Sequence, residues 1–260
     1  MEFRLFLFCC LFVFAACSNK SKTLEIDILA HGGSGFYSDI NPFPPNSLPA
    51  IEKGMGNPAI DGIEVDVQCS RDTQMWLYHD NNLQYFCDVN RVLWQMTTAE
   101  LQEVQYQKPK SDFSPIVTLD QLISLSNAHP DRKIRVQLKA DTSFCFEAFL
   151  QRDFPPQFSF SLSSWENYIR LRDKYPERTW LTSNQLDLVN DYFKARLPYG
   201  MELDFNVVSK NGVRLMINNG LKISLYGMRG MADYSIIQDW QMHEVQVDNV
   251  TQAFHGLNIQ

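Results

Sequence analysis

Short β-forming segments alternate with helix-like segments along most of the chain, and this alternation constrains the fold more than any other feature. Alternation of this kind is typical of α/β proteins with parallel strands. Eight such units within 260 residues predict a (β/α)₈, or TIM, barrel. The predicted strands are residues 26–31, 62–67, 133–139, 158–162, 179–182, 200–206, 222–226 and 244–248. The predicted helices between them include residues 47–53, 165–174, 185–193, 210–219 and 234–240.

One segment departs from this alternation. Residues 74–78 have the pattern of a strand but follow the strand at 62–67 after only six residues. A parallel neighbour needs a connection of roughly a dozen residues or more, so the sequence predicts an antiparallel hairpin appended to the barrel. Residues 81–130 then form an insertion between the second and third barrel strands, in which Thr97 and Thr118 each mark the start of a helix.

The N-terminus has the pattern of an export signal. A charged start is followed by an apolar run at residues 5–14, which is too short to span a bilayer, since that needs roughly 20 residues. Two alanines precede Cys17 and resemble a bacterial lipobox, so residues 1–16 are predicted to be a lipoprotein signal peptide and Cys17 the lipidated residue. An ordinary signal peptide with a stray cysteine is the alternative. The prediction places the protein in the bacterial cell envelope, at the outer membrane or the periplasmic face. It would be held to the membrane only by its lipid, with residues 17–24 as a tether and 25–260 as the barrel domain.

Composition and cysteine usage argue against two kinds of site. The net charge is −7 and no stripe of lysine and arginine occurs, which argues against a nucleic-acid partner. Beyond Cys17 three cysteines remain, Cys69, Cys87 and Cys145, and no CxxC spacing occurs, so a zinc site is not expected. Because three cysteines cannot all pair, at least one stays free. Cys69 and Cys87 flank the same segment, and a disulfide between them is one option. The sequence carries no signal of oligomeric state.

Two histidines and two carboxylates on predicted strands form the strongest chemical signal. His31 ends the first strand, where barrel enzymes keep their chemistry, and His79 ends the hairpin strand. Glu64 and Asp66 are two residues apart, so both face the same side of the second strand. Imidazoles can transfer protons and paired carboxylates can hold Ca²⁺ or Mg²⁺, which together are the parts of a metal-assisted hydrolase. An ion pair of one carboxylate with a nearby arginine or lysine is the alternative.

The third barrel strand ends in a second polar pair. Gln137 and Lys139 share a face, and a lysine there can bind a phosphate oxygen. A surface lysine and a Lys139–Glu64 ion pair are the alternatives. Asp80 follows His79 and can either fix its tautomer or cap the loop. Other residues at strand ends that can line the site are Ser161, Ser163, Asn206, Tyr226 and Asp248.

In their order and spacing these motifs resemble the glycerophosphodiester phosphodiesterase family. Members of that family carry H-R-G, E-N-T, E-x-D, H-D-x-x-L and E-x-K motifs in this order. The similar stretches here are His31-Gly32-Gly33, Asn46-Ser47, Glu64-Val65-Asp66, His79-Asp80-Asn81-Asn82-Leu83 and Gln137-Leu138-Lys139. The family's T-x-x-E-L and P-T-L-x-x-L motifs are similar to residues 97–101 and 117–122.

The resemblance implies a TIM barrel that hydrolyses a small phosphodiester partner. The implied reaction converts glycerophosphodiesters to glycerol 3-phosphate and an alcohol, with Ca²⁺ or Mg²⁺ as cofactor. The roles it implies are general acid and base for His31 and His79, metal ligation for Glu64, Asp66 and Gln137, and substrate binding for Lys139, Gly32 and Asn46.

Two positions depart from the family pattern. The family's arginine after the first histidine is Gly32 here, so one phosphate clamp is absent from that position. The family's third carboxylate ligand is Gln137, whose amide oxygen can bind Ca²⁺ but brings no charge. Two alternatives therefore stand beside the hydrolase. One is an envelope lipoprotein that binds phosphodiesters without turnover, and the other is a related lyase or an enzyme for a different diester.

Overall fold

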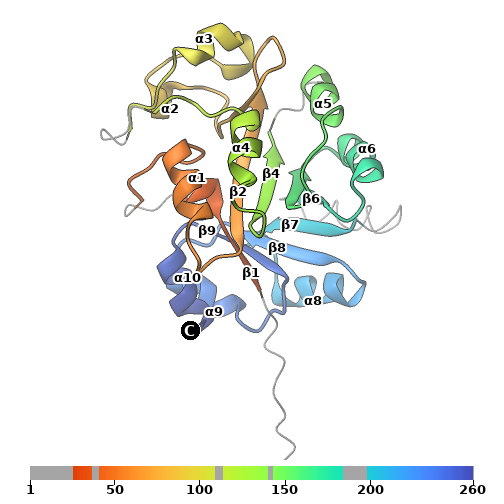
Figure 1. The fold of residues 1–260 in the computed structure, drawn as a ribbon. Helices are drawn as coiled ribbons and strands as arrows, with labels where there is room; N and C mark the ends of the chain where they lie inside the picture. Colours follow the sequence, from red (N-terminus) through yellow and green to blue (C-terminus); the bar gives the residue numbers. More distant parts are fainter. Residues whose placement is uncertain (1–25, 37–40, 109–113, 140–142, 184–197, 260) are drawn as a thin grey trace, which may run out of the picture.

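The computed structural model describes residues 26–36, 41–108, 114–139, 143–183 and 198–259. Within these ranges eight parallel strands form a closed barrel (Figure 1). The strands are β1 Asp27–Ala30, β2 Gly62–Cys69, β4 Lys133–Leu138, β5 Phe158–Leu162, β6 Thr179–Ser183, β7 Gly200–Asp204, β8 Lys222–Tyr226 and β9 Glu244–Val247. Strand β1 pairs with both β2 and β9, which closes the sheet. The predicted TIM barrel is confirmed.

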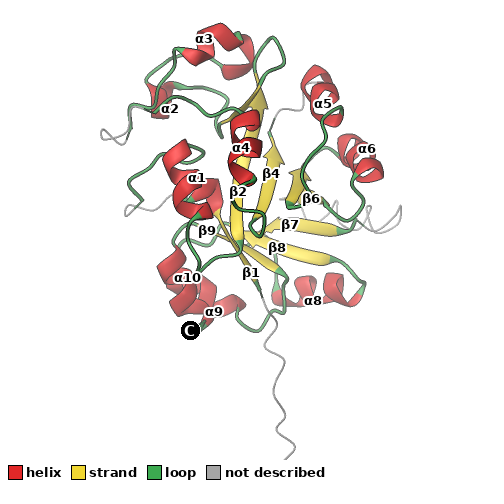
Figure 2. Ribbon diagram, viewed as in Figure 1, coloured by secondary structure: helices red, strands yellow, loops and turns green. Residues whose placement is uncertain are grey.

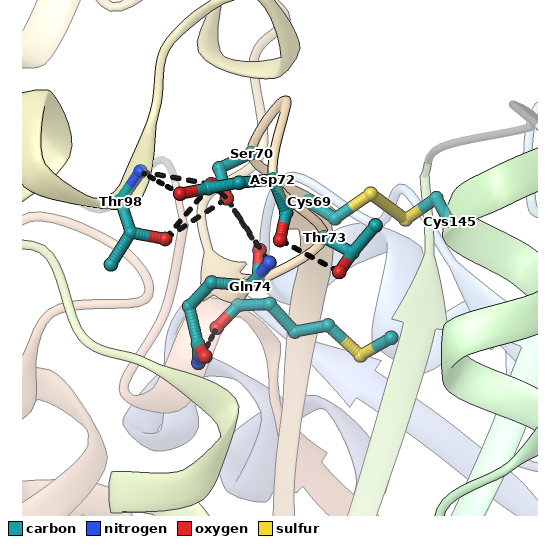
Figure 3. Close-up of a disulfide and its surroundings, with 8 residues drawn as sticks. Cys69, Ser70, Asp72, Thr73, Gln74, Thr98 and Cys145 are labelled. Atoms are coloured by element: carbon teal, nitrogen blue, oxygen red, sulfur yellow. Dashed lines mark hydrogen bonds between the residues drawn. A yellow bond between two sulfur atoms is a disulfide. The ribbon is translucent and has the colours of Figure 1, made fainter.

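The ninth strand forms the predicted hairpin. Strand β3, Met75–Leu77, pairs antiparallel with β2, with Val67 opposite Leu77. The turn between the strands is tied to the insertion, because the Asp72 carboxylate accepts hydrogen bonds from the backbone nitrogen and the hydroxyl of Thr98 (Figure 3). The hairpin therefore joins the barrel to the segment that follows it.

The insertion builds a small lobe with an apolar core of its own. Its helices are α2 Gln84–Cys87, the 3₁₀ helix η2 Leu93–Gln95 and α3 Thr98–Gln102. The last helix of the insertion, α4 Leu119–Ser126, instead buries Leu119 and Leu122 in the barrel core. Helices α3 and α4 each begin at a predicted threonine, Thr97 and Thr118, and each carries a full capping box. Figure 1 shows α2 and α3 beyond one end of β2. The lobe core contains Trp76, Tyr78 and Tyr106.

Helices surround the barrel, mostly where the sequence predicts them (Figure 2). They are α1 Leu48–Met55, α5 Ser143–Leu150, α6 Trp165–Lys174, α8 Lys210–Asn218, α9 Met231–Ile237 and α10 Val250–Leu257. The helix predicted at 234–240 begins and ends earlier, since Asp233 in its first turn accepts a hydrogen bond from the backbone nitrogen of Arg229. The predicted helix at 185–193 lies outside the described residues. Across the described ranges, no helix combines the length and the apolar character needed to cross a bilayer.

The disulfide differs from the pairing considered above. Cys69 at the end of β2 is bonded to Cys145 in α5, with their Cα atoms 5.9 Å apart (Figure 3). The Cys69–Cys87 option is therefore wrong. Cys69 and Cys87 do not pair because Cys87 lies in the lobe core beside Tyr78, where it is buried as a free thiol. Burial raises the pKa of this thiol to about 12.

The barrel interior is polar, whereas its outer face is apolar. Residues 63, 65 and 67 of β2 pack with the helices, and the carboxylates between them point inward. Further inside, Arg135 on β4 lies 3.1 Å from Glu202 on β7 and 2.9 Å from Glu244 on β9. All three side chains are buried, and the guanidinium of Arg135 also stacks over Trp180. A buried network of this kind holds its members in fixed positions because each needs its partners.

Candidate active site

His31 lies where β1 ends, in the short 3₁₀ turn His31–Gly33. Its Nδ1 atom lies 2.8 Å from Asp248 Oδ1, just beyond β9, and its Nε2 atom lies 3.8 Å from Glu64 Oε2. A carboxylate can only accept, so Asp248 keeps the proton on Nδ1 and orients the ring. Burial lowers the pKa of His31, but the bond to Asp248 and the surrounding carboxylates outweigh it and raise the pKa to about 9.

His79 shares an aromatic neighbour, Phe36, with His31. Phe36 stacks on His31 with ring centroids 4.9 Å apart and meets His79 edge-on at 4.6 Å. The Nδ1 atom of His79 lies 2.7 Å from Asp80 Oδ1. Of the two roles considered for Asp80, the structure therefore shows the contact that fixes the tautomer. Phe36 therefore contacts both imidazoles.

Glu64 and Asp66 are almost fully buried, and neighbouring groups hold each of them. The backbone nitrogen of Gly32 donates to Glu64 Oε2 at 3.2 Å. The Asn46 amide donates to Asp66 Oδ2 at 2.8 Å and accepts from the Asp66 backbone nitrogen at 2.9 Å. Lys139 Nζ lies 3.2 Å from Asp66 Oδ1, an ion pair without good hydrogen-bond geometry. The ion pair considered between Lys139 and Glu64 is thus made with Asp66 instead.

The two buried carboxylates repel each other, and this moves their pKa values apart. Burial and the neighbouring Asp66 charge raise the pKa of Glu64 to about 8. Burial also disfavours the ionised form of Asp66, but nearby cations, Lys139 first among them, hold its pKa below the ordinary range. The pKa of Glu64 is raised and the pKa of Asp66 is lowered, as expected of two like charges that share a site. A divalent cation would relieve this repulsion.

The residues present fit a divalent cation, though with fewer charges than a three-carboxylate site. Among the described residues no group donates a hydrogen bond to Asp66 Oδ1, which is buried. No cluster of three or more His, Cys, Asp or Glu side chains in the described ranges is arranged to hold a metal. The third position is the amide of Gln137, which lies beside Asp66 in the β2–β4 register. The site therefore offers two carboxylates and one amide oxygen, all hard ligands.

A cavity of about 370 Å³ opens at this end of the barrel. The structure brings His31, His79, Gln137 and Lys139 together on its lining. Ser163, Asn206, Tyr226 and Asp248 also line it, as the sequence predicts, whereas Ser161 is fully buried.

Gly32 and Asn46, for which the resemblance implies substrate binding, contact the acidic pair in the structure. Both are buried, and neither is part of the cavity lining in the described structure. Their backbones are left-handed, with φ of 60° and 65°, which glycine and asparagine tolerate best. They bind the carboxylates Glu64 and Asp66, so they position the acidic pair.

Some residues of the cavity were missed from the sequence. Glu202 and Asp204 on β7, Gln246 on β9 and Arg229 after β8 all line it. The alternation of Gly200, Glu202 and Asp204 on one strand face was a usable signal for the first two. Nothing local marked Arg229, which follows the strand after a glycine and a methionine.

Fold and site together define a TIM-barrel enzyme whose two histidines and buried acidic pair lie where parallel barrels keep their catalytic groups. The family model described as "Glycerophosphoryl diester phosphodiesterase family" matches residues 32–252, and the chain belongs to that family of phosphoric diester hydrolases. Enzymes of the family typically use divalent metals. No curated protein matches the chain.

Solved structures of low sequence identity share the fold. A protein from Galdieria sulphuraria superposes with a TM-score of 0.76 at 16% identity, covering 92% of this chain and 100% of its own. An Oleispira antarctica phosphodiesterase, in complex with the product sn-glycerol-3-phosphate, has a TM-score of 0.75 at 15% identity, with 89% and 96% covered. The glycerophosphodiester phosphodiesterase from Thermotoga maritima has a TM-score of 0.65 at 19% identity, with 86% and 95% covered.

Proposed function

We propose that this protein hydrolyses glycerophosphodiesters to glycerol 3-phosphate and an alcohol, with Ca²⁺ or Mg²⁺ as cofactor. The observation that carries the proposal is the placement of His31 and His79 on one cavity beside the buried pair Glu64 and Asp66. The product bound to the Oleispira antarctica relative supports the same substrate class. A metal bound by the two carboxylates and the Gln137 oxygen would supply positive charge for the phosphoryl oxygens.

The histidines serve as general acid and base in this proposal. Asp248 and Asp80 each hold a histidine through Nδ1, so Nε2 is the atom of each ring that exchanges a proton with the attacking or the leaving oxygen. Phe36 packs against both rings and limits their movement. In-line displacement at phosphorus needs such groups on opposite sides of the reacting atom.

Two basic side chains on the cavity suit the phosphate. Lys139 lies against Asp66 and also lines the cavity, where its ammonium can contact a phosphoryl oxygen. Arg229 lies at the exposed rim of the same cavity. In this proposal it supplies the guanidinium that Gly32 does not, from a different strand end.

Release of glycerol 3-phosphate tests the reaction. Choline, ethanolamine and glycerol diesters are incubated with the protein and Ca²⁺, Mg²⁺ or Mn²⁺, and EDTA should abolish release. His31→Gln and His79→Gln should each lower kcat by roughly 10²–10⁴, the usual contribution of a general acid or base. His255→Gln on the exposed face of α10 is the matched control and should retain activity. A cyclic phosphate product would indicate a lyase, and ligand binding without turnover would indicate a binding protein.

We also propose that the protein is a lipoprotein of the bacterial cell envelope, anchored through Cys17 at the outer membrane or periplasmic face. The Cys69–Cys145 disulfide supports export, because disulfides persist in oxidising compartments. Cys17→Ser should abolish labelling by a fatty-acid analogue and leave the precursor uncleaved. Labelling that persists in this variant would contradict the proposal.

A further inference from the structure

Gln137 is held by a carboxylate on the other side of the barrel interior. Its Nε2 atom donates to Glu202 Oε1 at 3.0 Å, across the space between β4 and β7. An ionised carboxylate only accepts, so this contact requires the amide nitrogen and not the amide oxygen. The nitrogen of the Gln137 amide therefore faces Glu202, and its oxygen faces away from Glu202. The Oε1 atom of Gln137 has no hydrogen-bond donor among the described residues and is left for the cavity.

Glu202 is itself held in one orientation. Its Oε2 atom accepts from Arg135 at 3.1 Å and from Gln246 at 2.8 Å, while Oε1 also accepts from Thr182 at 3.3 Å. The side chain is only 1% exposed. A buried carboxylate with donors on both oxygens cannot turn without losing several hydrogen bonds, so its hold on Gln137 is rigid.

We propose that Glu202 is a positioning residue that turns the oxygen of Gln137 toward the acidic pair and so completes the metal site in place of the family's third carboxylate. The inference rests on the proposed function, since it assumes that Glu64 and Asp66 bind a cation. Asp66 is the register partner of Gln137 on the adjacent strand, so Gln137 on the cavity lining and Asp66 of the acidic pair are direct neighbours on one face of the sheet. In this proposal the Gln137 amide takes the place of the family's third carboxylate, and Glu202 holds that amide in position.

This arrangement has a consequence for substitutions at both positions. Gln137→Glu would place two carboxylates about 3 Å apart, and their repulsion would oppose any gain in metal affinity. Glu202→Gln would let the Gln137 amide turn either way. In the double variant Gln137→Glu/Glu202→Gln, the amide at position 202 donates to the carboxylate at position 137. The negative charge then lies at position 137, next to the acidic pair.

Calorimetric titration of Ca²⁺ into the whole protein tests the proposal, with Mg²⁺ as a second arm. Glu202→Gln should weaken Ca²⁺ binding about 10-fold or more, the usual cost of losing a group that orients a ligand. Gln137→Glu alone should not bind more tightly than the wild type. The double variant should bind at least as tightly as the wild type and about 10-fold more tightly than Glu202→Gln.

Glu244→Gln is the matched control. Glu244 is buried and pairs with Arg135 as Glu202 does, but the described structure shows no contact between Glu244 and Gln137. Equal losses of affinity in Glu202→Gln and Glu244→Gln, or no recovery in the double variant, would overturn the role of Glu202. If that occurs while the wild type still binds metal and releases product, the proposed function stands. A wild-type protein that binds neither metal overturns both.

Discussion

At the residue scale, the position of His79 depends on a buried glutamine two residues beyond Asp66. The Nε2 atom of Gln68 donates to three successive carbonyl oxygens, those of Tyr78, His79 and Asp80, at 2.9, 3.1 and 2.8 Å. Gln68 points into the barrel from the same face of β2 as the acidic pair, because the three residues alternate along the strand. One strand face thus sets both the metal site and one of the two histidines.

Gln68→Met keeps the length of the side chain and removes all three hydrogen bonds. We expect kcat to fall and the free energy of unfolding to drop by about 1–3 kcal/mol, since buried carbonyls lose their donor. Steady-state kinetics and urea unfolding measure the two effects. Gln95→Met, at an exposed position of the insertion lobe, is the control and should change neither kcat nor the free energy of unfolding. Unchanged kcat in Gln68→Met would mean that the His79 loop is held by other contacts.

At the scale of elements, β2 connects more parts of the site and the barrel than its length suggests. It pairs with β1, β3 and β4, carries the acidic pair, and ends at the disulfide to α5. The bond joins residues 76 apart in the sequence, so it restricts a large part of the unfolded chain. In the chain-entropy model a loop of this length stabilises the folded state by about 4 kcal/mol.

Cys145→Ser should therefore lower the melting temperature markedly, and reductant should have little further effect on the variant. Differential scanning calorimetry with and without reductant measures both. Cys87→Ala is the control, because Cys87 is free and its loss leaves reductant sensitivity intact. Unfolding without reductant of protein that lacks residues 1–17 should expose one reactive thiol, that of Cys87. A wild-type melting temperature that is the same with and without reductant would contradict the prediction.

Most of the elements were predictable because their signals are local. Each barrel strand is a short segment in which apolar residues predominate or alternate with polar ones, and the hairpin followed from a connection too short for a parallel crossover. The starts of α3 and α4 followed from threonines with Glu or Gln three residues on. His31, Gln137 and Lys139 were placed on the cavity by strand register alone.

The remaining features depend on partners that are distant in the sequence. Gln137 meets Glu202 65 residues further on, and Cys69 meets Cys145 across 76 residues. No local pattern encodes such contacts, because they arise only when the barrel closes. The hydrogen bond between Asn46 and Asp66 is another such contact, since it exists only in the folded chain.

At the scale of the whole molecule, the barrel interior concentrates negative charge on which stability depends. Glu64, Asp66, Glu202 and Glu244 are all buried, and in the described structure the basic side chains of His31, Arg135 and Lys139 pair with them. A bound cation stabilises the folded state by mass action, about 2.7 kcal/mol at 100 times the dissociation constant. For a chain of this size that free energy raises the melting temperature by roughly 5–10 °C. Calorimetry with Ca²⁺ should show the increase, EDTA should reverse it, and Glu64→Gln should abolish it.

The same charges predict how the metal-free protein responds to pH. The folded state raises the pKa of Glu64 from 4.5 to about 8 and that of His31 from 6.5 to about 9, so it binds more protons than the unfolded chain. Stability in EDTA should therefore fall as the pH rises from about 5 to 9, by up to about 1.4 kcal/mol per pH unit for each group. Glu64→Gln should flatten this decline, and saturating Ca²⁺ should oppose it in the wild type because the cation replaces the proton on Glu64. Urea unfolding at several pH values measures the slope. A free energy of unfolding that rises with pH over this range would show that folding does not raise the pKa values of Glu64 and His31.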